Sequence, residues 1–145
     1  MWVLSIIAVI LVAVLVALLA WTRRASRFSV SVAAPAHVAL GEQCVIEVEI
    51  SNEAQQPIVL AMVTVDDTFT EHFEGLYLTP PPKSQAAALR GRAWSYGVEV
   101  QPNAHFSVSL TGRAARFGIA KGEIQAIGAN LLGTGRLVEI GIGTS

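Results

Sequence analysis

The sequence predicts an all-β domain that follows a single membrane-spanning helix. Three observations predict this fold class: an uninterrupted apolar run at the N-terminus, a group of arginines directly after it, and alternating apolar and polar residues through the rest of the chain. A chain of 145 residues suits one globular domain. We therefore expect a transmembrane helix at 1–21, a basic juxtamembrane segment at 22–27 and a β-domain at 28–145.

The helix is predicted from the length and composition of the run from Trp2 to Trp21. This run contains no charged residue, glycine or proline, and Ser5 is its only ordinary polar side chain. As an α-helix it spans about 30 Å, close to the thickness of the hydrocarbon core of a bilayer. A cleaved signal peptide is the alternative, but the run lacks a basic N-terminal region and a short apolar core, so we expect the helix to be retained. The two tryptophans fall where interfacial aromatic residues lie.

The distribution of charge predicts the orientation of the chain and limits its partners. Arg23, Arg24 and Arg27 follow the apolar run, and basic residues beside a span are retained preferentially on the cytoplasmic side. We expect an inner-membrane protein with its N-terminus outside and its β-domain in the cytoplasm, with a periplasmic domain as the alternative. The arginines suit phospholipid headgroups, so the lipid bilayer is an expected partner. Residues 28–145 carry seven basic and eleven acidic side chains, which disfavours a nucleic-acid partner.

From residue 28 onward, alternating residues predict half-buried strands. Segments rich in proline, glycine, asparagine or serine separate them and indicate turns. In the segment SQAAALRGRAW, residues 84–94, the alanines favour a short helix instead. The predicted strands lie at 28–32, 44–51, 58–66, 76–79, 94–100, 105–111, 114–127 and 136–142.

Seven or eight short strands spaced by about ten residues are typical of an immunoglobulin-like β-sandwich. A closed β-barrel is the alternative architecture. Cys44 is the only cysteine, so the domain lacks the disulfide of antibody domains. The sandwich is therefore expected to depend on its apolar core alone.

Two stretches carry a resemblance to known modules. The segment VAAPAHVALGEQCVIEVEISNEAQQPIVLAMVTVDD resembles the opening of many bacterial Ig-like modules. The segments RRASRFSVSV and GRAARFGIAKGEIQAIGANLLG are similar to the membrane-proximal Ig-like region of the DUF58 family. This resemblance implies a bacterial, membrane-anchored, non-catalytic interaction module, and it implies no metal site.

The residues with chemical potential have structural interpretations that we favour. Cys44 shares a strand face with Ile46 and Val48, so we expect a buried thiol and not a nucleophile. The segment DDTFTEHFE, residues 66–74, offers metal donors, but its spacing matches neither an EF-hand nor a zinc helix motif, so a solvated acidic loop is expected. We expect no catalytic residue, cofactor, metal or small-molecule substrate.

Candidate contact residues flank the long segment LTPPPKSQAAALRGR. Aromatic residues and arginine are favoured anchors of protein interfaces, and a segment of this length exceeds what a minimal sandwich requires. The alternative is that the aromatic rings fill the core. A gathering of the basic side chains of Arg90, Arg92, Arg113 and Arg116 at one end of the sandwich is a further hypothesis. The candidate contact residues are Phe69, Phe73, Tyr77, Trp94, Tyr96, Arg90 and Arg92.

These features predict an accessory protein without catalytic activity. We expect a structural scaffold subunit that braces a larger integral-membrane complex of a respiratory, photosynthetic or transport kind. The alternative is a tethered binding module that recognises a soluble or envelope protein.

Overall fold

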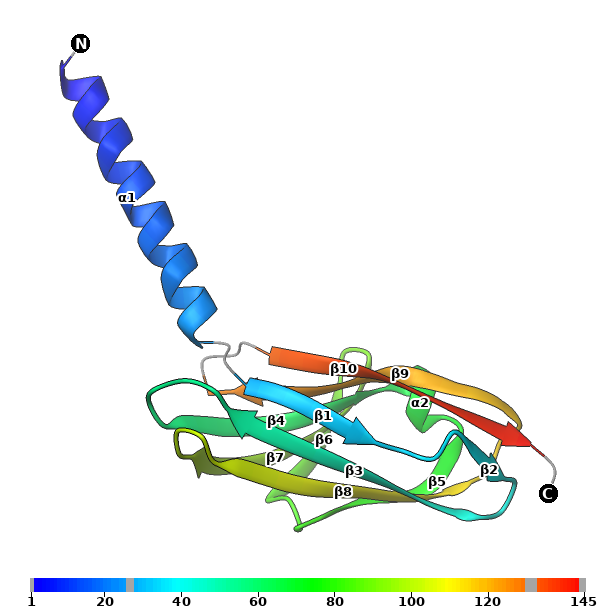
Figure 1. The fold of residues 1–145 in the computed structure, drawn as a ribbon. Helices are drawn as coiled ribbons and strands as arrows, with labels where there is room; N and C mark the ends of the chain where they lie inside the picture. The colour runs from blue at the N-terminus through cyan, green and yellow to red at the C-terminus, as the bar shows by residue number, and fades with distance from the viewer. Residues whose placement is uncertain (1, 26–27, 130–132, 144–145) are drawn as a thin grey trace.

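A computed structural model describes residues 2–25, 28–129 and 133–143, with side chains from 2–20 in the first range. It consists of one N-terminal helix and a domain of two stacked β-sheets (Figure 1). The helix projects from one end of the sandwich, at which the first strand begins. We call this the helix-proximal end and the opposite one the distal end.

Helix α1 (Trp2–Ala25) is long and apolar enough to cross a bilayer. Its residues from Trp2 to Ala20 have a mean hydropathy of 3.3, and none of them is buried. The helix continues past the predicted boundary at residue 21, because the arginines and the alanine that follow favour helix. Met1 and Arg27, which belong to the predicted transmembrane and juxtamembrane segments, lie outside the described residues.

The two sheets contain all ten strands of the described chain. Neighbouring strands are antiparallel except for the parallel pair of β2 and β10. The four-stranded sheet has the order β1 (Phe28–Ala33), β3 (Gln43–Asn52), β8 (His105–Ala114) and β5 (Phe73–Thr79). The six-stranded sheet has the order β2 (His37–Ala39), β10 (Gly133–Gly143), β9 (Gly118–Gly128), β4 (Ile58–Asp66), β7 (Gly91–Val100) and β6 (Ser84–Ala88).

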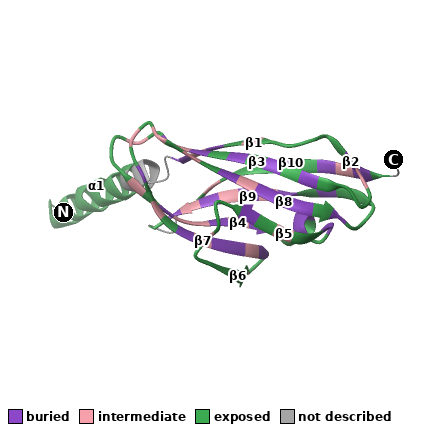
Figure 2. Ribbon diagram, turned by 90° about the horizontal axis from the view of Figure 1, so that it is seen from below, coloured by how far each residue is buried: buried purple, intermediate pink, exposed green. Residues whose placement is uncertain are grey.

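The core lies between the sheets and takes alternate residues from each strand (Figure 2). Along β3 every second residue is buried, and Cys44 is 2% exposed, which confirms that it faces the core. The largest enclosed side chains come from both sheets and include Trp94, Leu110 and Ile124. Two separate sheets around one core confirm the predicted immunoglobulin-like β-sandwich.

Four local features differ from the sequence-based expectation. β6 is a strand where alanines favoured a helix, because it pairs with β7 and joins it through a tight turn, and this pairing outweighs the weak helix propensity. β2 forms in a segment expected to be a connection, and α2 (Asp67–Thr70) is a single helical turn. The predicted strand 114–127 is divided by a turn before Gly118, whose φ of 118° suits glycine.

A buried asparagine fastens the loops at the helix-proximal end. Asn52 is fully buried, and its side-chain amide donates hydrogen bonds to the carbonyl oxygens of Gln56 at 2.9 Å and Val100 at 2.8 Å. Its side-chain oxygen accepts a hydrogen bond from the backbone N–H of Ala54 at 2.8 Å. Because Asn52 also lies opposite Phe28 in the register of β1 and β3, this network stands directly beside the connection to the helix.

The Asn52 network predicts a large loss of stability on truncation. Asn52→Ala leaves buried backbone groups without partners, so we expect the free energy of unfolding to fall by about 2–4 kcal/mol. Denaturant unfolding of the detergent-solubilised protein, followed by circular dichroism, measures this change. Gln55→Ala, in the same loop but exposed, serves as the control, and equal destabilisation by both variants would contradict the assigned role.

Candidate partner-binding surface

The hairpin of β6 and β7 forms the margin of the larger sheet. β6 is the last strand of the six, and Ser84, Gln85, Ala86 and Ala87 are all exposed. Figure 2 shows β6 exposed at the edge of the sandwich, next to the largely buried β7. The long segment singled out in the sequence thus forms an exposed hairpin and not an irregular loop.

Hydrogen bonds hold this hairpin in a defined position. Before β6, the hydroxyl of Tyr96 donates to the carbonyl oxygen of Pro80 at 2.8 Å, and the N–H of Lys83 donates to the carbonyl oxygen of Ser95 at 2.7 Å. At the turn after β6, the carbonyl oxygen of Arg90 accepts a hydrogen bond from the N–H of Asp67 at 2.7 Å. The exposed strand is therefore anchored at both of its ends.

The hairpin carries positive charge on an otherwise acidic domain. Residues 80–98 contain Lys83, Arg90 and Arg92 and no acidic residue, so the remainder of 28–145 carries four basic and eleven acidic side chains. None of the three cations forms an ion pair with another described residue. At the end of the neighbouring strand β4, the carboxylate of Asp66 accepts a hydrogen bond from the backbone N–H of Glu123 at 2.9 Å. Leu89, at the tip of the turn, is 100% exposed.

The structure separates the candidate contact residues into exposed and buried groups. Arg90 and Tyr77 are exposed, and Arg92 is half-buried. The other four aromatic residues belong to the core, which corrects their assignment as contact residues and supports the alternative that rings fill the core. These are Phe69 (0% exposed), Phe73 (7%), Trp94 (1%) and Tyr96 (3%).

The reason for their burial is visible in the packing. The rings of Phe69 and Phe73 lie 5.0 Å apart, where α2 and the start of β5 close the distal end of the core. Trp94 and Tyr96 occupy alternate positions on β7 and face the other sheet, where Tyr96 meets Phe106 edge-on at 5.3 Å. The alternation of Trp94 and Tyr96 with Ser95 was the signal in the sequence that predicts an inward face.

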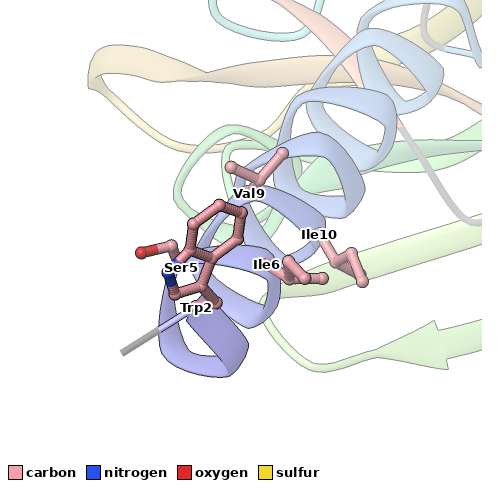
Figure 3. Close-up of a pocket in the computed structure, with 5 residues that line it drawn as sticks. All are labelled: Trp2, Ser5, Ile6, Val9 and Ile10. Carbon is pink, nitrogen blue, oxygen red and sulfur yellow. The ribbon is translucent and has the colours of Figure 1, made fainter.

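The predicted membrane-interface residues are described only in part. Trp2 is 86% exposed on α1. Figure 3 shows a shallow hollow beside its ring, lined by residues of one helix face, including Ser5 and Ile10. This hollow thus lies on the surface of a single apolar helix. The side chains of Trp21, Arg23 and Arg24, and the whole of Arg27, lie outside the description.

Cys44 has the environment of a structural thiol. Its side chain is enclosed between the sheets, and this burial raises the pKa of the thiol. A raised thiol pKa lowers the population of the nucleophilic thiolate. The expected structural role of Cys44 is consistent with this environment.

The acidic segment 66–74 is folded into α2 and the start of β5. Its ionisable side chains contact neighbouring elements: the Nδ1 atom of buried His72 lies 3.3 Å from the carbonyl oxygen of Arg116, and a carboxylate oxygen of Glu74 lies 3.3 Å from Nε of Arg113. In the part of the chain that the structure describes, no three histidine, cysteine, aspartate or glutamate side chains are grouped to hold a metal ion.

The structure agrees only in part with the hypothesis that four arginines gather at one end of the sandwich. The ends of β7 and β8 bring all four to the distal end. However, Arg113 pairs with Glu74, and Arg116 lies 3.8 Å from Glu71, on the side of the four-stranded sheet. Arg90 and Arg92 belong to the other sheet. Of these four arginines, the two without an ion-pair partner among the described residues, Arg90 and Arg92, therefore both belong to the β6–β7 hairpin.

Comparison with known proteins identifies the fold and goes no further. No family model and no curated protein matches the sequence, so the resemblance to DUF58 stays a prediction. The CARDB domain of the PF1109 protein from Pyrococcus furiosus, solved in complex with di-metal ions, is similar in structure with a TM-score of 0.56 and 11% identity, over 84% of this chain and 97% of that one.

Two other solved structures give the same result. A cohesin module from a Clostridium perfringens family 33 glycoside hydrolase has a TM-score of 0.53 and 10% identity, over 83% of this chain and 99% of that one. Red sea bream transglutaminase has a TM-score of 0.55 and 15% identity, over 81% of this chain and 15% of that one. The chain thus has an immunoglobulin-like, CARDB-type fold preceded by an apolar helix.

The anchoring of the hairpin by Tyr96 predicts a dependence of stability on pH. Burial raises the pKa of Tyr96 to about 12, above its value of about 10 in an unfolded chain. Between pH 10 and 12 the unfolded chain loses a proton that the folded chain keeps, so the free energy of unfolding falls as the pH rises through this window. Tyr96→Phe removes this contribution and also lowers stability at pH 8 by about 1 kcal/mol, because the hydrogen bond to Pro80 is lost.

Denaturant unfolding at pH 8 and pH 11 measures both effects. Tyr77→Phe, at an exposed position, is the matched control. A Tyr96→Phe protein with the same loss of stability between the two pH values as the parent would contradict the assignment.

Proposed function

We propose that the protein is a non-catalytic, single-pass membrane protein that serves as a structural accessory subunit of a larger integral-membrane complex. In this proposal α1 packs against the membrane part of the complex, and the sandwich braces its extramembrane face. The β6–β7 hairpin is the surface that faces the partner. The proposal extends to the class of this complex, which is respiratory, photosynthetic or transport.

The observation that carries this proposal is the short connection between helix and sandwich. α1 ends at Ala25 and β1 begins at Phe28, so the two elements are separated by at most about 11 Å of extended chain. With α1 in a bilayer, the domain stands at the membrane surface and has little freedom to reach distant partners. A rigid domain in that position suits a partner in the same membrane.

The orientation is part of the same proposal. The arginines after the apolar run favour a cytoplasmic sandwich at the inner membrane, with the N-terminus outside. The resemblance to the membrane-proximal Ig-like region of the DUF58 family supports a sandwich of this kind beside a membrane helix.

A tethered binding module is the second candidate function. The exposed Leu89 and the cationic hairpin favour it, because they lie towards the distal end of the sandwich, where a soluble or envelope protein has access. In that case α1 acts only as a tether.

Native electrophoresis separates the two functions. After extraction in a mild detergent, an accessory subunit co-migrates with a large complex, because its helix and its sandwich both contact the complex. Migration as a free small protein, under conditions that keep other membrane complexes intact, would exclude the accessory role.

The orientation is tested by cysteine accessibility. A tag with a single cysteine at the C-terminus is expected to resist a membrane-impermeant maleimide in intact cells and to react after the membrane is opened. The same tag at the N-terminus is the control and reacts in intact cells. Labelling of the C-terminal tag in intact cells would establish a periplasmic sandwich.

A further inference from the structure

We propose that β6 is a strand-addition site, which binds an extended edge strand of another protein chain bearing acidic side chains. This inference rests on the proposed function, because it describes how the accessory subunit holds its partner. It joins two properties of the same hairpin: an unprotected sheet edge and an unpaired positive charge.

The edge of β6 has the main-chain groups that strand addition requires. β6 pairs with β7 and is the terminal strand of its sheet, so its other side has no strand partner among the described residues. A row of backbone N–H and C=O groups without strand partners is a template for a further strand.

The other edges of the sandwich are protected. On β5 the register shifts between Glu74 and Tyr77, and Gly75 between them has a φ of 64°, so the edge bulges. β2 is only three residues long, and β1 packs against β10 of the other sheet. β6, with the sequence SQAAA, contains no bulge, proline or charged residue. It therefore lacks the features that normally prevent edge-to-edge pairing.

The charge around β6 specifies the character of the added strand. Lys83 precedes the strand, Arg90 follows it, and Arg92 lies opposite Ala87 on β7. These cations have no ion-pair partner among the described residues. A strand bearing aspartate or glutamate supplies that partner, and complementary charge of this kind sets the specificity and rate of association.

The surface of β6 also favours a strand that belongs to a sheet over a free peptide. Gln85 and Ala86 point to opposite faces of the sheet, and both are exposed. An added strand therefore finds no apolar groove on either face, and five residues of main-chain pairing alone give marginal stability. An edge strand of a folded β-domain brings its own core and loses little conformational entropy on pairing.

A second copy of this chain is a poor occupant. Pairing of two β6 strands brings together two hairpins of like charge, with no acidic residue between positions 80 and 98 to offset it. Charge therefore favours a different chain.

Lipid is a poor occupant as well. A lipid supplies no main chain to pair with the edge of β6, and the hairpin carries only Lys83, Arg90 and Arg92, fewer cations than the clusters of about four to eight that recognise anionic headgroups.

Site-specific photocrosslinking tests the inference. Gln85→benzoylphenylalanine is introduced into the full chain, and membranes of the cells that produce the protein are irradiated and analysed by mass spectrometry. We expect a crosslink to a strand with aspartate or glutamate residues in a different protein. The matched control is Leu137→benzoylphenylalanine, on the exposed face of β10, and we expect it to give no crosslink to that strand.

Charge variants separate a specific contact from chance proximity. Arg90→Glu combined with Arg92→Glu is expected to lower the crosslink yield from position 85 about tenfold. Lys121→Glu combined with Arg136→Glu makes the same change in net charge outside the hairpin and is expected to leave the yield unchanged. Ala87→Pro, with its fold verified by circular dichroism, is expected to abolish the crosslink, because the register with β7 directs the N–H of Ala87 towards the free edge. Arg90→Glu alone, in the exposed turn, is expected to lower the yield even if the other variants do not fold.

The outcomes distinguish this inference from the proposed function. A crosslink to a second copy of this chain, a crosslink to lipid, or a yield that is insensitive to Arg90→Glu would overturn strand addition by an acid-bearing partner. Co-migration with a large complex without any crosslink from position 85 overturns the inference and leaves the accessory role standing. Migration as a free small protein overturns both.

Discussion

The short connection between α1 and β1 is the constraint on which the arrangement of the molecule depends. Because only two residues separate Ala25 from Phe28, the first strand must start where the helix ends. Every other strand of the two sheets runs roughly parallel or antiparallel to β1. The turns therefore form two sets, one beside the helix and one far from it. The Asn52 network stabilises the first set, and the hydrogen bond between Asp67 and Arg90 belongs to the second. The turn of the β6–β7 hairpin belongs to the set far from the helix for the same reason.

The two ends of the sandwich are stabilised by different interactions. At the helix-proximal end, one buried amide satisfies the main chain of two loops, which is a directional and specific arrangement. At the distal end, packing of Phe69 against Phe73 covers the core, and exposed ion pairs at its rim add little stability. The loops nearest the helix are thus held by a buried side-chain amide, and the far end combines apolar contact with main-chain hydrogen bonds such as that from Asp67 to Arg90.

The fold could be predicted from the sequence wherever the pattern is local. The alternation through Cys44, Ile46 and Val48 determines both the strand and its buried face, and the structure agrees. β6 could not be predicted in this way, because its alanines have no period and become a strand only through pairing with β7. The candidate surface was predicted in part. The exposure of the segment and of Arg90 was expected, whereas the burial of Trp94 depends on which face of β7 meets the other sheet. The absence of acidic residues from 80 to 98 was visible in the sequence and would have identified the cationic hairpin.

The strand order of the larger sheet has a consequence for biosynthesis. β4 pairs with β7 and also with β9, and β10 lies between β9 and β2, so the centre of this sheet comes from segments far apart in the chain. The sheet therefore cannot close until the residues of β9 and β10 have left the ribosome. By then α1 has already left the ribosome. Pairing between distant segments is slow, so we expect the β-domain to fold late, well after α1 has been synthesised.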